Sequence, residues 1–238
     1  DHLQVRSVYK VENTVTLNQR ANSLFGKIMM GLQYMAFKTG PLTMPPSQLG
    51  AFAKSDPYQS SPNIEWHVQP LSLDKFGEPL HRFNAITPSV CNLRPSSRGH
   101  IRIKSPDAIV SPGITLNYLS TEEDRRVAVE GIRFTRRIMS APALSKYRPT
   151  EVKPGPDLNN TEELLHAAAE LGTTIFHPVG TCKMGNDPMA VVNDRLLVHG
   201  IGGLRVIDAS IMPRITSGNT NAPTVMIAEK GAKFIQEG

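Results

Sequence analysis

The chain has 238 residues, of which 39% are hydrophobic and 20% are charged. These fractions are ordinary for a soluble globular protein and exclude a long disordered chain. The net charge is +5, but the basic residues are scattered and form no stripe interleaved with aromatic residues, so we expect no nucleic-acid partner. No apolar run is long enough to span a bilayer, so we expect no membrane span.

The cysteine content argues against a disulfide framework and against a metal site. Only Cys91 and Cys182 occur, and two cysteines cannot staple a fold of this size. No group of Cys and His residues has the sequence spacing typical of zinc ligands. We therefore expect no metal.

The first predicted helix covers residues 16–38, where apolar residues recur at helical spacing. The stripe is rich in methionine, and we interpret it as core packing rather than as a functional surface. Gly40 and Pro41 then break the chain.

Residues 40–118 are predicted to form mostly antiparallel sheet with loops. The segments 63–70 and 99–105 alternate between apolar and polar residues. Alternation of period two predicts strands with one buried face and one solvent-exposed face.

Two helices are expected next. Ser120 and Glu123 have the spacing of a capping box and predict a helix that ends near Ser140 and covers the sheet. Asn160 and Glu163 predict a second helix, through about residue 171. The segment between them, 146–160, is polar and rich in proline, which is typical of a connector.

The end of the chain predicts a short buried strand at 204–207, which ends at Asp208, and a final helix to about Ile235. Pro223 suits the first turn of that helix, because its missing N–H needs no partner there.

Candidate functional residues gather in this last quarter. His177 follows an apolar run and precedes a Pro-Val-Gly turn, and Asn219 and Asn221 come just before the final helix. Each has an ordinary structural explanation: a satisfied structural histidine, an N-cap at Asp208, and turn residues. Taken singly, these residues do not separate a structural role from a chemical one.

Taken together, these residues resemble the C-terminal signature of the glucose-methanol-choline (GMC) oxidoreductases. The similarity follows the order and identity of residues in the segments 176–185, 203–210 and 217–224. Asp1 and His2 resemble the loop before the substrate domain of that family. The segments 40–42 and 94–99 resemble landmarks within that domain, so the resemblance spans nearly the whole chain.

The resemblance implies FAD-dependent oxidation of an alcohol to a carbonyl by hydride transfer to flavin N5. His177 matches the general base, a role that suits histidine because its ordinary pKa lies near the working pH. Asn221 matches the residue that orients the substrate oxygen, and Asn92 matches a residue of the substrate pocket. The substrate expected is a neutral primary alcohol, and the sequence leaves open whether the enzyme is an oxidase or a dehydrogenase.

The resemblance also assigns the cofactor segments. The positions that match FAD contacts are Asp208 and Ala209 for the diphosphate and ribityl part, and Asn221, Pro223 and Thr224 for the pyrimidine side of the isoalloxazine. The Gly-x-Gly-x-x-Gly loop that would hold the FAD pyrophosphate does not occur among these residues. We therefore expect an N-terminal FAD-binding half, on the same polypeptide or on a separate chain, without which the enzyme is inactive.

The fold expected is α+β: an antiparallel sheet backed by helices, plus the C-terminal portion of an FAD-binding α/β domain. Residues 1–6 would be a remnant of the FAD-binding domain, 7–160 the substrate-binding domain, and 161–238 the returning part of the FAD-binding domain. One alternative is a non-catalytic binding or structural module derived from the same family. Another is a carbohydrate- or lipid-binding sheet domain, which would explain residues 40–118 but not 176–224.

Overall fold

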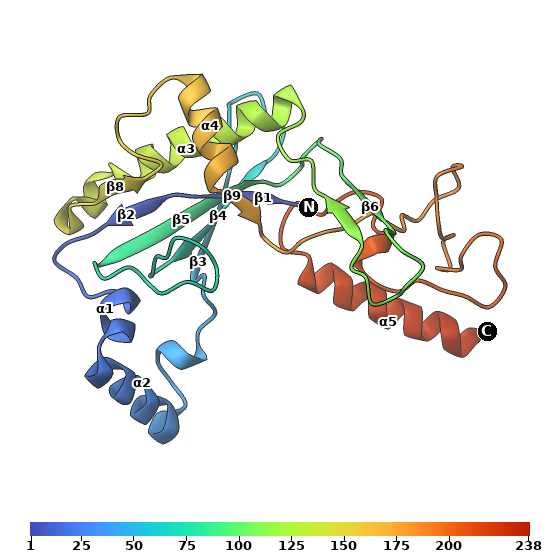
Figure 1. The fold of residues 1–238 in the computed structure, drawn as a ribbon, viewed down its shortest axis with the longest axis horizontal. Helices are drawn as coiled ribbons and strands as arrows, with labels where there is room; N and C mark the ends of the chain where they lie inside the picture. Colours follow the sequence, from blue (N-terminus) through green and yellow to red (C-terminus); the bar gives the residue numbers. More distant parts are fainter. The chain divides into compact units, whose positions relative to one another are not determined.

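The computed structural model describes residues 1–238, and they form two compact units. Residues 4–92 and 125–173 make the sheet unit, and residues 1–3, 93–124 and 174–238 make the C-terminal unit. The sequence-based division assigns 93–124 to the substrate-binding domain, whereas the structure groups these residues with the C-terminal segment. Figure 1 shows the fold of residues 1–238.

An antiparallel sheet of seven strands is the framework of the sheet unit, as expected from the sequence. Its main path runs β3-β4-β5-β1-β9, and β2 pairs with both β5 and β8. The strands are β1 (Leu3–Arg6), β2 (Val8–Lys10), β3 (Leu49–Ala53), β4 (Ile64–Gln69), β5 (Ala85–Asn92), β8 (Thr150–Lys153) and β9 (Gly172–Thr174).

Three of these strands were not expected. β1 and β2 lie in the first ten residues, and β8 lies inside the segment interpreted as a connector. β8 has only four residues, and its pairing with β2 includes a register shift, so the segment is too short to give a clear strand pattern in the sequence. Such strands form because a partner strand offers its backbone groups, and local sequence does not record that partner.

The helix α3 (Glu122–Met139) packs on one face of the sheet, as predicted. The indole N–H of Trp66 on β4 donates to Thr135 Oγ1 at 2.8 Å. Gly131 faces Val90 on β5, and a Cβ at Gly131 would stand 3.1 Å from a Val90 methyl group. The glycine therefore allows α3 to approach the sheet closely.

The cap of α3 differs from the prediction by one residue. The Asp124 N–H donates to Thr121 Oγ1 at 3.3 Å, so Thr121 and not Ser120 supplies the capping hydroxyl. The Ser120 N–H instead donates to Ser97 Oγ. For α4 (Thr161–Leu171) the predicted capping box of Asn160 and Glu163 is confirmed in both directions.

The opposite face of β1, β5 and β4 is polar and nevertheless buried; we call it the polar face. Directly paired residues on one face of a sheet lie side by side, so the register sets two rows across three strands. The rows are Gln4, Cys91 and Glu65, and then Arg6, Ser89 and His67, and no side chain in them belongs to a residue more than 9% exposed.

The expectation of a solvent-exposed face on the strand at 63–70 is therefore wrong. Polar alternation shows which side chains share a face of the strand, but it does not show whether that face is covered.

The predicted helix at 16–38 is two helices, α1 (Leu17–Asn22) and α2 (Leu24–Phe37), followed by the 3₁₀ turn η1 (Pro41–Thr43). Ser23 separates them and caps α2 by accepting from the Gly26 N–H at 3.3 Å. The expected core packing of the Met-rich stripe is wrong, because α2 has no buried residue. Helical spacing identifies an apolar face but not a partner that covers it.

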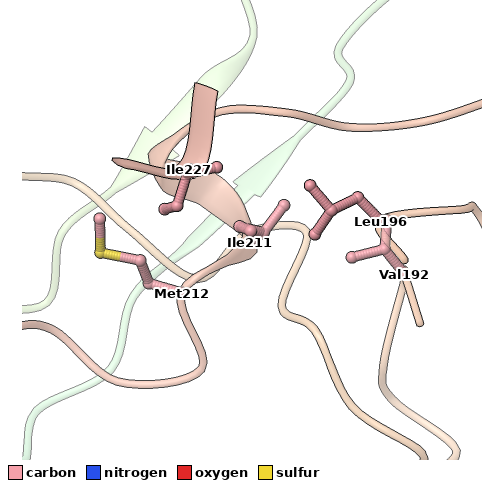
Figure 2. Packing of buried hydrophobic residues seen from close by; sticks show 5 residues of the cluster. All are labelled: Val192, Leu196, Ile211, Met212 and Ile227. Atoms are coloured by element: carbon pink, nitrogen blue, oxygen red, sulfur yellow. The ribbon is translucent and has the colours of Figure 1, made fainter. Parts of the chain in front are cut away.

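The C-terminal unit contains the hairpin of β6 (His100–Arg102) and β7 (Gly113–Thr115), the 3₁₀ turn η3 (Ala209–Ile211) and the helix α5 (Asn221–Glu237). The 3₁₀ turn η2 (Pro142–Tyr147) belongs to the sheet unit. A small hydrophobic core joins η3 and α5 to the long loop that precedes η3 (Figure 2), and it consists of Val192, Leu196, Ile211, Met212 and Ile227.

Three expectations for this unit can be compared with the structure. The final helix is confirmed, with Pro223 in its first turn. The strand near 99–105 is confirmed at 100–102, but all three of its residues are exposed. The buried strand at 204–207 is wrong, because only an isolated bridge from Arg205 to Leu197 forms there. No helix of the structure combines the length and the apolar character that crossing a membrane requires.

Candidate active site

Two histidines that are 175 residues apart in the sequence meet in the C-terminal unit. His177 is only 8% exposed, and its Nδ1 lies 3.0 Å from Nδ1 of His2, which is fully buried. The rings meet edge to face, with centroids 5.2 Å apart. His2 Nε2 lies 3.1 Å from the carbonyl oxygen of Leu93.

This arrangement assigns the tautomers of both rings. A carbonyl oxygen only accepts, so His2 Nε2 must carry the proton and donate to Leu93. In neutral His2 the other nitrogen, Nδ1, is then an acceptor, and His177 Nδ1 must donate to it. Neutral His177 is therefore protonated on Nδ1, which leaves a lone pair on Nε2.

Asp1 holds the segment that carries His177. Its carboxylate accepts from the His177 backbone N–H at 2.9 Å, from Thr174 Oγ1 at 2.7 Å and from the hydroxyl of Tyr118. Burial raises the pKa of Tyr118, which keeps the phenol protonated and able to donate. The carboxylate thus joins three segments of the unit at one point.

Phe176, just before His177, has a φ of +65°. A bulky residue seldom adopts this left-handed conformation, and the surrounding contacts must hold it. One of them is the bond from the Phe176 N–H to Thr174 Oγ1, at 2.8 Å. The sequence motif identified His177, but neither Asp1 nor His2 was expected to contact it, because 175 residues separate the two histidines.

Asn221, the second predicted catalytic residue, is the first residue of α5, and it is exposed. The start of this helix is not capped: Thr220 provides no side-chain hydrogen bond, and the first turn contains no acidic residue. The Thr224 side chain bonds backward to the Thr220 carbonyl at 2.7 Å. The pairing of Asn221 with His177 at one substrate stays a prediction.

Asp208 and Ala209 lie at the start of η3. Asp208 Oδ1 accepts from the Ser210 N–H at 2.7 Å, so Asp208 is the N-cap of this turn. The residue itself is exposed and Ala209 is half-buried. Capping does not use all four lone pairs of a carboxylate, so the group retains capacity to accept a further hydrogen bond.

Asn92, the predicted pocket residue, is the last residue of β5 in the sheet unit. It pairs with Ile64 on β4 and is half-buried. Its contact with a substrate stays a prediction.

The chain is similar to proteins of one family. A family model described as GMC oxidoreductase matches residues 95–228. An alcohol dehydrogenase [acceptor] of Pseudomonas putida is 39% identical over 236 residues, which are 99% of this chain and 43% of that protein. An oxygen-dependent choline dehydrogenase of Paraburkholderia xenovorans is 40% identical over 99% of this chain and 42% of that protein.

A solved structure of the formate oxidase of Aspergillus oryzae, studied for the modification of its FAD, has a similar fold. Its TM-score is 0.88 at 23% identity, over 100% of this chain and 46% of that one. The antiparallel sheet backed by helices is thus an architecture that this chain shares with a solved oxidase. The chain spans less than half the length of the relatives that it matches.

Proposed function

Because the chain belongs to the GMC oxidoreductase family, we propose that it is the catalytic C-terminal part of an FAD-dependent enzyme that oxidises an alcohol to a carbonyl. The observation that carries the proposal is the pair His2–His177, whose hydrogen bonds assign a lone pair to His177 Nε2. A structural histidine needs only satisfied nitrogens. A base needs one defined nitrogen that can accept a proton, and this geometry supports that requirement.

Oxidation of an alcohol removes a hydroxyl proton and the two electrons of a C–H bond. In the proposed mechanism, His177 accepts the hydroxyl proton at Nε2 while Nδ1–H remains bonded to His2. Asn221 donates its amide N–H to the substrate oxygen and holds it next to the base. FAD, when bound, supplies the acceptor for the hydride.

The residues assigned to FAD suit the group chemically. The uncapped start of α5 leaves backbone N–H groups without helical partners, and these groups and the positive end of the helix dipole favour a carbonyl or an anion. Asn221, Pro223 and Thr224 would form the side that meets the flavin pyrimidine. The carboxylate of Asp208 suits a ribityl hydroxyl, which can donate to it, better than it suits a phosphate.

We infer that the remaining grip on the cofactor comes from an N-terminal half, as the length of the relatives suggests. In this proposal the returning part of the FAD-binding domain is 161–238, the substrate-binding domain is 7–160, and residues 1–6 belong with the former. Asn92 would line the substrate pocket. The substrate proposed is a neutral primary alcohol, aromatic or aliphatic.

The alternative, a non-catalytic module of the same family, is favoured by no specific contact. A module that only binds or supports another protein has no chemical need for a buried histidine pair with assigned tautomers. The Asp1 carboxylate, which holds the His177 segment by its backbone, would equally be unnecessary.

The test is turnover by the full-length protein reconstituted with FAD. We expect carbonyl product from a panel of aromatic and aliphatic primary alcohols, formed in step with consumption of oxygen or of an artificial electron acceptor. A protein that binds FAD but converts no alcohol in the panel would support the non-catalytic alternative.

A further inference from the structure

A second group of reactive side chains lies in the sheet unit, on the polar face. Glu65 and His67 of β4 and Cys91 of β5 each offer one metal-ligating atom, and these atoms lie within 4.8 Å of one another. All three residues are buried. They belong to the sheet unit, whereas His2 and His177 belong to the C-terminal unit.

The sheet register explains why these three meet. Residues two apart on one strand point to the same face, which places Glu65 next to His67. Cys91 pairs directly with Glu65 across the β4–β5 ladder. The strands are long, β5 with eight residues and β4 with six, so this geometry rests on regular sheet rather than on loops.

The group also contains buried polar atoms that form no hydrogen bond. Glu65 Oε2 and His67 Nε2 are buried and form no hydrogen bond, although Glu65 is only 3% exposed. Ser89, which pairs with His67 across the ladder, likewise has an unbonded Oγ. Buried polar atoms that lack partners cost free energy unless something binds them.

The chemistry of the three ligands selects the ion. A thiolate and an imidazole are soft or borderline ligands, which favour zinc over magnesium and calcium. One carboxylate and one thiolate carry two negative charges, which a divalent cation balances, so the loaded site is neutral among its ligands. We propose that Glu65, His67 and Cys91 bind a zinc ion in the sheet unit.

The observed separation suits this ion. His67 Nε2 lies 3.4 Å from Glu65 Oε1. Tetrahedral zinc with N and O ligands at about 2.0–2.2 Å would separate them by roughly the same distance. The fourth position would hold water, for which the Ser89 hydroxyl is a hydrogen-bonding partner.

Without the ion, burial, reinforced by the nearby Glu65 carboxylate, raises the pKa of Cys91 to about 12, so the thiol keeps its proton. Binding displaces that proton, as it does at other zinc thiolates. The bound ion then links β4 to β5.

The sequence analysis did not predict this site. Two of the ligands are spaced i, i+2, and the third follows 24 residues after His67. Strand pairing sets this spacing, which differs from the short Cys and His spacings of zinc motifs.

The experiment uses the full-length protein with FAD, grown with zinc and then dialysed against a weak chelator. We expect one zinc per chain by elemental analysis, and we expect cobalt in place of zinc to give a thiolate-to-cobalt charge-transfer absorption. Less than about a tenth of an equivalent of metal after loading would overturn the proposal, because a site with buried thiolate and imidazole ligands should retain zinc.

Matched variants assign the ligands. Glu65→Gln keeps the shape of the side chain and should weaken zinc binding at least about ten-fold, as loss of a ligand requires. Cys182→Ser removes the other cysteine of these 238 residues and should leave both the zinc content and the cobalt absorption unchanged. Because Cys182→Ser retains Cys91, it shows whether Cys182 supplies the thiolate even if Cys91→Ser does not fold. Loss of the cobalt absorption in Cys182→Ser would contradict the assignment.

Discussion

The two units differ in how their buried polar groups are bonded. In the C-terminal unit, the nitrogens and oxygens of Asp1, His2 and His177 bond to one another and to backbone groups. On the polar face of the sheet unit, Glu65 Oε2, His67 Nε2 and buried atoms of other residues form no hydrogen bond. In the first arrangement hydrogen bonds fix both histidine rings, whereas in the second several buried polar atoms form no hydrogen bond.

The difference indicates what each region can do. In the C-terminal unit, hydrogen bonds hold the proton of neutral His177 on Nδ1. The lone pair is then on Nε2, and a nitrogen that can accept a proton is what a base requires. An open cluster is unstable until a ligand satisfies it, which is what a binding site requires.

The largest effect is expected from His177→Ala. Loss of the base should lower the turnover number for alcohol about 10²–10⁴-fold in the full-length enzyme with FAD. His166→Ala is the matched control, since this α4 side chain is 74% exposed and should leave turnover unchanged. Full activity in His177→Ala would remove His177 from the mechanism.

His2 should act on the rate through His177. His2→Leu removes the acceptor for His177 Nδ1–H and should lower the turnover number about 10–100-fold, with a smaller change in KM. His2→Asn places an amide oxygen near the former Nδ1 and should recover part of the loss. Equal losses in both variants would indicate that His2 only fills space.

Two buried hydroxyls in the sheet unit differ in that one forms hydrogen bonds and the other forms none. Thr135 accepts from Trp66 and donates to Gly131, whereas Ser89 Oγ has no partner, and both residues are fully buried. In metal-free protein, Thr135→Val should lower the free energy of unfolding by about 1–3 kcal/mol because Trp66 loses its acceptor. Ser89→Ala should leave it unchanged or raise it. Denaturant unfolding measures the change in free energy of unfolding for both variants. An equal destabilisation would mean that the Ser89 hydroxyl does form a hydrogen bond in the folded protein.

The smallest effect concerns the thiols. Burial raises the pKa of Cys91 to about 12, so at mildly alkaline pH this thiol stays protonated and unreactive. Cys182 is half-buried. After removal of metal, iodoacetamide should therefore modify Cys182 first, as peptide mass spectrometry would show. Equally fast modification of Cys91 would mean that its surroundings are open to solvent.

The sequence predicted those features that local pattern controls. The capping box of Asn160 and Glu163, the alternation on β4 and the proline in the first turn of α5 are each recorded within a few residues. The sequence did not predict where distant segments meet. Local spacing records neither the contact of His2 with His177 nor the pairing of Glu65 with Cys91. The first arises because the chain folds back on itself, and the second is set by the register of β4 and β5.

The Met-rich helix α2 is a second feature that local sequence did not fully predict. Its apolar spacing is real, yet Leu24, Phe25 and Phe37 are 76%, 73% and 74% exposed. Periodicity shows the direction in which a face points, but tertiary structure decides whether that face is covered.

The most direct test of the central claim is anaerobic mixing of the full-length flavoprotein with a primary alcohol while the flavin absorbance is recorded. Our account predicts that alcohol bleaches the oxidised flavin bands within the turnover time, and that His177→Ala bleaches them about 10²–10⁴-fold more slowly. Flavin that stays oxidised with every alcohol, or that bleaches equally fast in the variant, would contradict it.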